Sequence, residues 1–210
     1  MSIKNQGTMI IISSPSGAGK TTLTKLLSER LNFHISISHT TRKPRENEIE
    51  AKDYFFLSEK EFQEMVIKDR FIEYAKVFDN FYGTSKDQVI EKLESGKNVI
   101  FDIDWQGAKQ IREKKLKFNL LTFFVLPPSK EELIKRLSNR EKENSSIIQR
   151  RMRDFDNDVK HWIDYDCVVV NDDKEECFNE INKNINSFNN GARLDNKKEY
   201  ILEHIEKLTN

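Results

Sequence analysis

The sequence predicts an α/β fold in which a parallel-sheet core carries an inserted mixed α/β subdomain and a helical lid. Three features predict it. Short apolar runs rich in isoleucine, valine and phenylalanine recur along the chain, segments with helical spacing separate them, and a glycine-rich turn follows the first run. Strands that alternate with helices are typical of βαβ units, whose parallel strands are buried on both faces.

Four apolar runs are expected to form the core strands. The helix after the first run has leucines at helical spacing over residues 20–31, and Cys177, Ile181 and Ile185 repeat that spacing near the end of the chain. The expected core strands are residues 9–13, 98–104, 120–126 and 167–171.

Two segments interrupt this alternation. Residues 36–96 contain "YFFLS", "FIEYAKVF" and "NFYGTS", which favour short antiparallel strands, with a helix near residues 59–68. Residues 128–160 are polar and arginine-rich, and "NREKENSS" indicates a break between two helices of a mobile lid. The expected division is a core of residues 1–35, 97–127 and 161–187, an inserted subdomain of 36–96, a lid of 128–160 and a polar tail of 188–210.

Composition excludes several classes of function. The 210 residues carry 35 basic and 35 acidic side chains, a balance that predicts neither a nucleic-acid partner nor attraction to an anionic membrane. Two cysteines without metal-site spacing predict neither a disulfide framework nor a zinc site. No signal peptide or run of 18 apolar residues is present, so we expect a soluble cytoplasmic protein, whose oligomeric state the sequence leaves undetermined.

The segment "SPSGAGKTT", residues 14–22, fits a phosphate-binding loop. Such a loop needs inward-facing backbone amides, a cation, a hydroxyl for a metal ion and the N-terminus of a helix. The usual first glycine is Ser14 here, which costs about 1–2 kcal/mol only if its φ is positive. An ordinary turn before a helix is the alternative. The expected phosphate contacts are Ser16, Gly17, Ala18, Gly19, Lys20, Thr21 and Thr22.

A second anion site is indicated by "SISHTTRKPRENEIEAKDYFF". Arg42 and Arg45 stand three residues apart and are followed by Tyr54, so two guanidinium groups and a hydroxyl can converge on one phosphate dianion. A solvated basic turn is the alternative interpretation. If the site is real, the protein binds a second phosphate group, separate from the one on the glycine-rich loop.

The motifs, taken in order, closely resemble the guanylate kinase family over roughly residues 9–187. They are "PSGAGKTTL", "SISHTTRKPRENE", "KDYFF", "FIEYA", "FYGTS", "DIDWQG" and "VVVNDD". The resemblance implies a nucleoside-monophosphate kinase with a P-loop core, a lid and a GMP-binding subdomain. It also implies Mg²⁺-dependent transfer of the γ-phosphoryl group of ATP to GMP or dGMP, in purine nucleotide metabolism.

The resemblance also implies which residues bind GMP. A carboxylate such as Glu73 can accept hydrogen bonds from both N1–H and the amine of guanine, whereas adenine presents an acceptor at N1. The alternatives to guanine binding are that Glu73 is a surface strand residue and that Thr84 is a turn residue. The implied phosphate contacts are Arg42, Arg45, Tyr54 and Tyr82, and the implied guanine-side contacts are Ser38, Glu73, Thr84 and Asp104.

The remaining implied roles concern ATP, magnesium and the transferred group. Thr21 and, through water, Asp102 would hold Mg²⁺, although two carboxylates at a strand end can instead cap the next helix. Arg136 would join the ATP contacts, and Asn171 would lie near the adenine. Phosphoryl transfer relies on alignment and positive charge rather than on a general base. The implied catalytic residues are Lys20, Arg42, Arg140 and Arg151.

Three departures from the family pattern bear on this interpretation, because Ser14, Asn47 and Ala51 replace family glycines. A noncatalytic protein-binding module and a kinase for a ribose phosphate are the rival functions. The first would be favoured by loss of the loop lysine or the lid arginines, and the second has no use for Glu73, Thr84 and Asp104. The sequence leaves open the preference between GMP and dGMP, the donor selectivity and the role of the tail.

Overall fold

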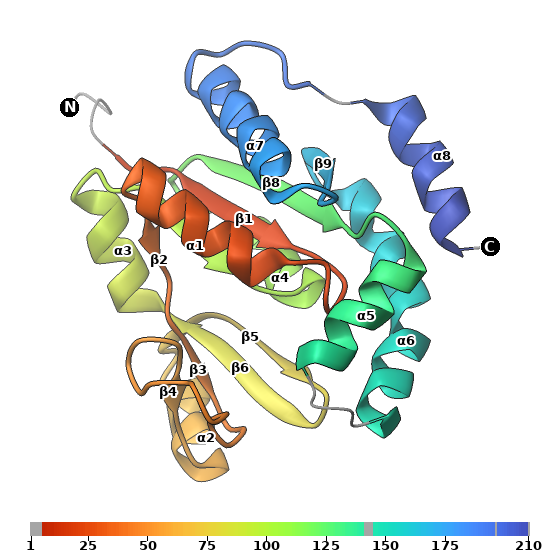
Figure 1. Ribbon diagram of the computed structural model, residues 1–210. Coiled ribbons are helices and arrows are strands. Elements are labelled where there is room, and N and C mark those ends of the chain that lie inside the picture. Colours follow the sequence, from red (N-terminus) through yellow and green to blue (C-terminus); the bar gives the residue numbers. More distant parts are fainter. Residues whose placement is uncertain (1–5, 141–144, 196, 210) are drawn as a thin grey trace. The chain divides into compact units, whose positions relative to one another are not determined.

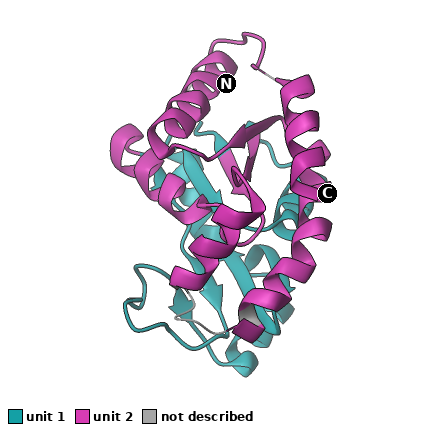
Figure 2. Cartoon of the chain, turned by 45° about the vertical axis from the view of Figure 1, so that its right-hand side comes forward, with its two compact units in different colours: residues 1–9, 33–120 teal, residues 10–32, 121–210 magenta. Residues whose placement is uncertain are grey.

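The computed structural model describes residues 6–140, 145–195 and 197–209, apart from the side chains of Arg140 and Ile147. These residues form two sheets with helices around them (Figure 1). The chain divides into two compact units, which Figure 2 colours separately. The first unit comprises residues 1–9 and 33–120, and the second comprises residues 10–32 and 121–210.

The larger sheet has five strands in the order β2-β7-β1-β8-β9. The pairs β2–β7 and β8–β9 are parallel, which confirms the predicted α/β class with a parallel sheet. Every residue of β1 and nearly every residue of β8 is buried, which accounts for their continuous apolar runs. The strands are β1 (Met9–Ser13), β2 (His34–Ile35), β7 (Val99–Asp102), β8 (Leu120–Leu126) and β9 (Cys167–Val170).

The smaller sheet belongs to the first unit and has the order β4-β3-β6-β5. Strands β5 and β6 form an antiparallel hairpin, and β3 pairs antiparallel with β6. The expectation of antiparallel strands throughout is wrong for β4, which runs parallel to β3. The long segment 41–54 carries the chain back before β4 starts, as a parallel connection requires. The strands are β3 (Ser38–Thr40), β4 (Phe55–Phe56), β5 (Phe71–Val77) and β6 (Asn80–Ser85).

Three helices belong to the first unit: α2 (Glu59–Ile67), α3 (Lys86–Glu94) and α4 (Trp105–Glu113). A capping box formed by Ser58 and Glu61 starts α2, whose buried Phe62 stacks on Phe71 with ring centroids 4.6 Å apart. The sequence did not predict α3, because only Val89 and Leu93 mark its buried face.

The second unit holds the remaining helices. Helices α1 and α7 pack against each other, and Arg30 forms an ion pair with Glu175 at 2.6 Å. The expected polar tail contains a helix, α8, whose Ile201 and Leu208 are buried. The elements are α1 (Lys20–Leu31), α5 (Lys130–Arg140), α6 (Ser145–Val159), the 3₁₀ helix η1 (Lys160–Asp164), α7 (Lys174–Asn189) and α8 (Lys198–Thr209).

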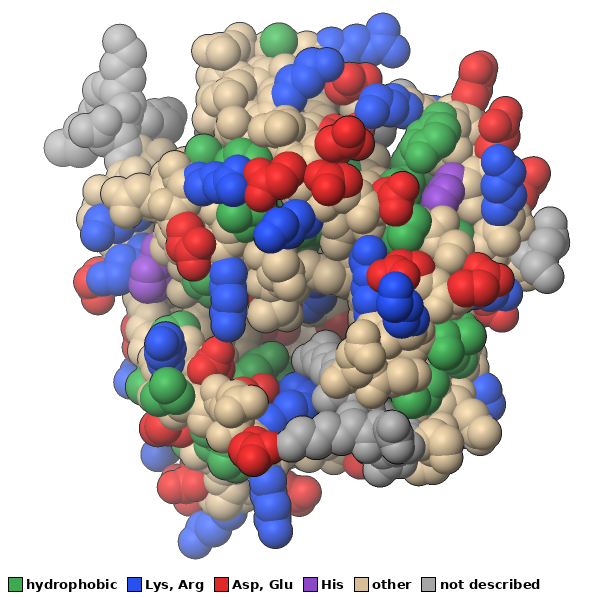
Figure 3. Space-filling view, in the orientation of Figure 1, with side chains coloured by type: hydrophobic (Ala, Val, Ile, Leu, Met, Phe, Trp, Pro, Cys, Tyr) green, Lys and Arg blue, Asp and Glu red, His purple; other side chains and the backbone are tan. Residues whose placement is uncertain are grey.

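Basic and acidic residues balance over the whole chain, at 35 each. On the face drawn in Figure 3, basic and acidic side chains are interspersed and do not gather into a large patch of one sign. None of the helices in the described ranges is long and apolar enough to cross a membrane. Attraction for an anionic ligand therefore has to come from local groups of residues.

Candidate active site

The glycine-rich loop of the second unit has the backbone geometry of an anion cradle. Gly17 and Gly19 have φ of 94° and 98°, values that disfavour any side chain. Gly19 is the N-cap of α1, and no side-chain hydrogen bond caps this helix among the described residues, so its N-terminus has the geometry of an anion-binding site. Ser14 does not have a positive φ, so its replacement of glycine introduces no left-handed strain.

Asn171 supports the loop from the end of β9. Its side-chain amide donates a hydrogen bond of 2.7 Å to the carbonyl of Ala18, and a Cβ on Gly19 would overlap the same amide nitrogen. Arg136 of α5 donates from Nη1 to the carbonyl of Asn171 at 3.1 Å. The structure therefore shows Asn171 and Arg136 bound to the loop or its neighbour, while their contacts with ATP stay predictions.

Helices α5 and α6, which the sequence predicts to form a lid, also reach the loop. A Cβ on Gly17 would lie 2.9 Å from methyl groups of Leu133 and Leu137 of α5, so a glycine is needed for this close packing. From α6, Arg151 donates from Nη1 to the hydroxyl of Ser16 at 2.8 Å. The other predicted lid residue, Arg140, ends α5 and has a side chain outside the described part of the structure.

The residues expected to bind phosphate and metal begin helix α1. Lys20 is its first residue, and the Thr21 and Thr22 side chains are exposed, whereas Leu23 and Leu27 are buried. The helix is thus anchored by its leucine face and presents Thr21 and Thr22 to solvent. The described residues include no group of three or more His, Cys, Asp or Glu side chains that could hold a metal alone.

In the first unit, a buried carboxylate marks the expected guanine-side contacts. Glu73 of β5 is only 3% exposed and accepts a hydrogen bond of 2.6 Å from the hydroxyl of Thr84 on the neighbouring strand β6. The hydroxyl of Ser38 on β3 lies 3.4 Å from that of Thr84. Burial, helped by the negative charge of Asp104, raises the pKa of Glu73 to about 7, against the opposing hydrogen bond from Thr84.

Asp104 and Gly107 complete this group. Asp104 caps α4 by accepting from the amide of Gly107 at 3.0 Å, and its contact with GMP stays a prediction. A Cβ on Gly107 would overlap the carboxylate of Glu73, which explains why a glycine lies in the first turn of α4. The second predicted carboxylate, Asp102, ends β7 and is half-buried. Its role with the metal stays a prediction.

The expected phosphate contacts of the first unit gather around one arginine. The guanidinium of Arg42 lies over the ring of Tyr54, with its Cζ 4.9 Å from the ring centroid. Tyr54 in turn makes an edge contact with Tyr82 at 6.1 Å. Arg45 joins the group through a shared carboxylate, that of Glu48, which lies 2.6 Å from Arg42 and 3.3 Å from Arg45.

Sequence reasoning assigned no role to Glu48, although it lies within the quoted motif. The available signal was an acidic residue three positions after Arg45, in a segment already singled out for its arginines. Ala51, farther along the same segment, has φ of 60° and donates a hydrogen bond to the carbonyl of Tyr54 at 2.8 Å. The replaced glycine at this position therefore does occupy the left-handed region, unlike Ser14 and Asn47.

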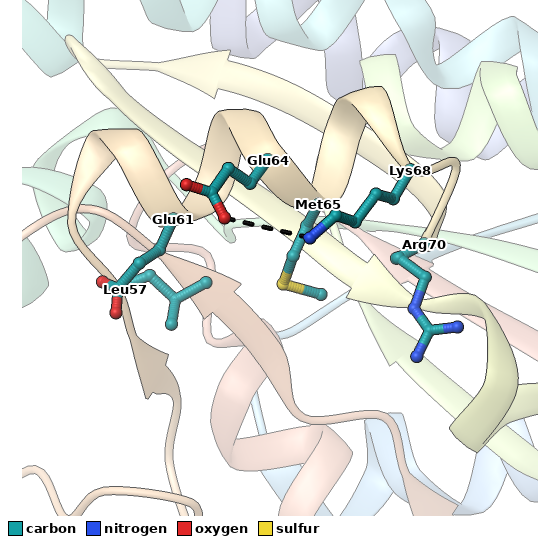
Figure 4. A pocket seen from close by; sticks show the side chains of 6 residues that line it. All are labelled: Leu57, Glu61, Glu64, Met65, Lys68 and Arg70. Carbon is teal, nitrogen blue, oxygen red and sulfur yellow. Dashed lines mark ion pairs between the residues drawn. The ribbon is translucent and has the colours of Figure 1, made fainter.

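A pocket of about 570 Å³ lies elsewhere in the first unit, along α2 (Figure 4). Its charged groups are engaged with their own surroundings, since Lys68 pairs with Glu64 at 3.9 Å and Arg70 pairs with Asp87 at 3.1 Å. It includes none of the predicted site residues. Its lining consists of Leu57, Glu61, Glu64, Met65, Lys68 and Arg70.

Comparison with known proteins agrees with these features. A family model described as guanylate kinase matches residues 6–188. A protein named guanylate kinase from Rickettsia felis is 48% identical over 184 residues, which cover 87% of this chain and 95% of that protein. Another of that name, from Wolbachia pipientis wMel, is 43% identical over 187 residues, with coverages of 89% and 92%. The crystal structure of guanylate kinase from Anaplasma phagocytophilum has a TM-score of 0.70 and 32% identity, with coverages of 88% and 87%. The chain thus belongs to the guanylate kinase family.

Proposed function

We propose that this protein is an ATP:GMP phosphotransferase, which transfers the γ-phosphoryl group of ATP to GMP or dGMP and so forms ADP and GDP or dGDP. The buried pair of Glu73 and Thr84 is the observation that carries the proposal. A carboxylate held away from water is costly unless a ligand supplies donors to it. Guanine has two adjacent donors, N1–H and the exocyclic amine, that match its two oxygens.

Guanine selection follows from the same pair. The charged form of Glu73 accepts both guanine donors, while Thr84 orients the carboxylate from the neighbouring strand. Adenine would place its N1 lone pair against the carboxylate and leave charge unpaired, so it is rejected strongly. Ser38 and Asp104 complete the guanine side of the site.

Phosphate binding is divided between the two units of the chain. In the second unit, Lys20 and the amides of residues 16–22 bind the phosphates of ATP. In the first unit, Arg42, Arg45, Tyr54 and Tyr82 bind the phosphate of GMP. Transfer requires the acceptor oxygen to approach the γ-phosphorus in line, so alignment of the two nucleotides supplies much of the rate.

Magnesium fits the residues of the loop. The exposed hydroxyl of Thr21 follows the lysine of the loop directly, and such ions take most of their ligands from substrate phosphates and water. Thr21 would hold the ion, with Asp102 contributing through water. When bound, the ion neutralises charge on the β and γ phosphates.

The lid arginines supply positive charge around the transferred group and help exclude water. Arg151, already bonded to Ser16 of the loop, is close to the expected phosphate position. Arg136 and Arg140 act with it, and Asn171 lies near the adenine. No general base is required for this chemistry. We place the reaction in the cytoplasm, with ATP and the acceptor nucleotide as the small-molecule partners.

An acceptor panel tests the proposal. Purified protein with ATP and Mg²⁺ is offered GMP, dGMP, AMP, CMP and UMP, and ADP release is followed in a coupled assay. We expect turnover with GMP and dGMP, and loss of that turnover when magnesium is chelated. Equal turnover with AMP would contradict guanine recognition by Glu73. GMP binding without turnover would instead favour a noncatalytic binding module.

A further inference from the structure

Glu48 lies at the centre of the acceptor phosphate cluster, yet no role has been assigned to it. Its two carboxylate oxygens accept from Nη1 and Nη2 of Arg42, each at 2.6 Å. They also accept from the backbone amide of Arg45 at 2.8 Å and from its Nη1 at 3.3 Å. Only 15% of the Glu48 side chain and 12% of the Arg42 side chain are exposed, so this is a largely desolvated pair with fork geometry.

The role of this carboxylate follows from which N–H donors of Arg42 it leaves unused. A guanidinium has five N–H donors. Glu48 takes one from each terminal nitrogen, and the carbonyl of Lys43 takes the other one on Nη1 at 2.9 Å. The one hydrogen on Nε and the second hydrogen on Nη2 share one edge of the group, and among the described residues no hydrogen bond uses that edge.

The plane of the guanidinium is fixed as well. Arg42 lies over Tyr54 and, at 5.8 Å, over Phe56. Stacking holds the plane, and the carboxylate fork fixes rotation within that plane. The edge that remains has the geometry needed to receive two oxygens of a phosphate.

We propose that Glu48 is a positioning residue for the acceptor phosphate, which holds Arg42 and Arg45 together, leaves the Nε–Nη2 edge of Arg42 open to phosphate oxygens and stays in place when substrate binds. This inference rests on the proposed function, because it takes Arg42 and Arg45 as the residues that bind the phosphate of GMP.

The charges support a permanent rather than a displaceable partner. Burial alone would raise the pKa of Glu48, but the hydrogen bonds from Arg42 and from the amide of Arg45 outweigh burial and lower it to about 2. The carboxylate therefore stays charged at neutral pH. Together with the two arginines it leaves one net positive charge for the incoming dianion. The opposite possibility is that Glu48 occupies the position of the phosphate and has to release Arg42 and Arg45 before GMP can bind.

The two possibilities predict opposite signs when Glu48 is changed to Gln. For a positioning residue, GMP affinity falls by roughly ten- to a hundredfold, which is the effect of one charge-assisted hydrogen bond. For a carboxylate that must leave, GMP affinity rises. Calorimetric titration of the full-length protein with GMP and with guanosine, combined with steady-state KM for GMP and ATP, measures the difference.

We expect Glu48→Gln to weaken GMP binding, to leave guanosine binding and KM for ATP unchanged, and to be partly rescued by Glu48→Asp. Glu59→Gln, which removes an exposed charge from the first turn of α2, is the matched control and should change none of these values. Tighter GMP binding, no change, or equal loss for GMP and guanosine would overturn the inference.

Arg42→Ala separates failure of this inference from failure of the site assignment. If Arg42→Ala weakens GMP binding and Glu48→Gln does not, the role of Glu48 is wrong while the acceptor site stands. If neither change affects GMP, the assignment of the acceptor site is wrong and the inference fails with it. Thermal unfolding of each variant identifies losses that come from misfolding.

Discussion

The two proposed nucleotide half-sites of this protein are built in different ways. In the second unit, the phosphate loop uses backbone amides, two glycines in left-handed conformations and a helix N-terminus. In the first unit, the proposed acceptor site consists of two groups of hydrogen-bonded side chains, one on β3, β5 and β6 and the other in the loop before β4. One half-site is a backbone conformation, and the other is a network of polar side chains.

This difference determines how each half-site responds to change. A backbone cradle tolerates substitution wherever φ stays negative and fails where a Cβ meets a neighbour. In a buried polar network, each charged group is stabilised by its hydrogen-bond partners. A substitution there removes a hydrogen bond or shifts the pKa of a neighbouring group. We therefore expect geometric effects in the loop and electrostatic effects in the acceptor site.

The largest effect is expected from Lys20→Ala. Removing the cation from an otherwise unchanged backbone cradle should lower kcat by about 10²–10³, as for other groups that stabilise transition-state charge. Lys25→Ala, an exposed lysine on the same helix, is the control and should keep its activity. Single-turnover rates at saturating ATP check the prediction. Full activity of Lys20→Ala would show that backbone amides suffice.

Gly19→Ala should test the cradle through its backbone. The new side chain has to adopt φ near 98° and overlaps the amide of Asn171, so we expect a loss of about 3 kcal/mol in unfolding free energy, from backbone strain and a broken buried hydrogen bond. Gly191→Ala is matched to it, because φ there is 65° and none of the described atoms lies within 4 Å of the new Cβ. It should cost only about 0.5–1 kcal/mol, because the strain of about 1–2 kcal/mol is partly offset by the lower freedom of the unfolded chain. Equal losses in urea unfolding would mean that Asn171 simply moves away.

The contrast between the half-sites also explains what the sequence could predict. The strand over residues 9–13 and the helix over 20–31 were predicted correctly, because the loop and its flanking elements are local in sequence. The pairing of Glu48 with Arg42, six residues away, was not predicted, since it depends on the conformation of the irregular segment between them. The direction of β4 depends on the return of the chain over residues 41–54.

The backbone conformation and burial of single residues could not be predicted from the sequence either. Ser14 and Ala51 both replace glycine, and nothing in the sequence distinguishes them, yet only Ala51 has a positive φ. Burial of Glu73 was also uncertain, because a surface strand residue would look the same in sequence. Contacts of Arg140, Tyr82 and the other assigned residues with nucleotides stay predictions.

The acceptor network should show its electrostatic character in pH dependence. The pKa of Glu73 in the free protein is about 7, and guanine binds its charged form, so binding at lower pH must release a proton. Guanosine affinity should therefore rise as pH increases toward 7 and level off above it. Glu73→Gln should bind guanosine roughly ten- to a hundredfold more weakly at pH 8, with no such dependence. Guanosine is used because the phosphate of GMP titrates near pH 6.

Glu73→Gln should weaken guanosine binding but increase the stability of the folded protein. A carboxyl whose folded pKa is raised lowers the stability of the protein as pH increases from about 4.5 to about 7, because the folded state then holds a charge that burial disfavours. Glu73→Gln should thus unfold at a higher temperature than the wild type at pH 8 and show a smaller gain near pH 4.5. A wild-type Tm that does not fall between these pH values, relative to the variant, would contradict a raised pKa.

The smallest effect is expected at the replaced glycines, where the rule for the phosphate loop can be tested inside the acceptor half. Ala51→Gly relieves a left-handed alanine, which costs about 1–2 kcal/mol, but increases the freedom of the unfolded chain by about 0.4–1 kcal/mol. We expect a net gain of about 0.5–1 kcal/mol in urea unfolding. Ser14→Gly has no strain to relieve, so the same entropy should make it neutral or slightly destabilising. Stabilisation by both changes, or by Ser14→Gly alone, would show that φ at these positions does not decide the outcome. A gain at Ala51 alone would mean that this half-site also depends on backbone conformation, at the turn that leads to Tyr54.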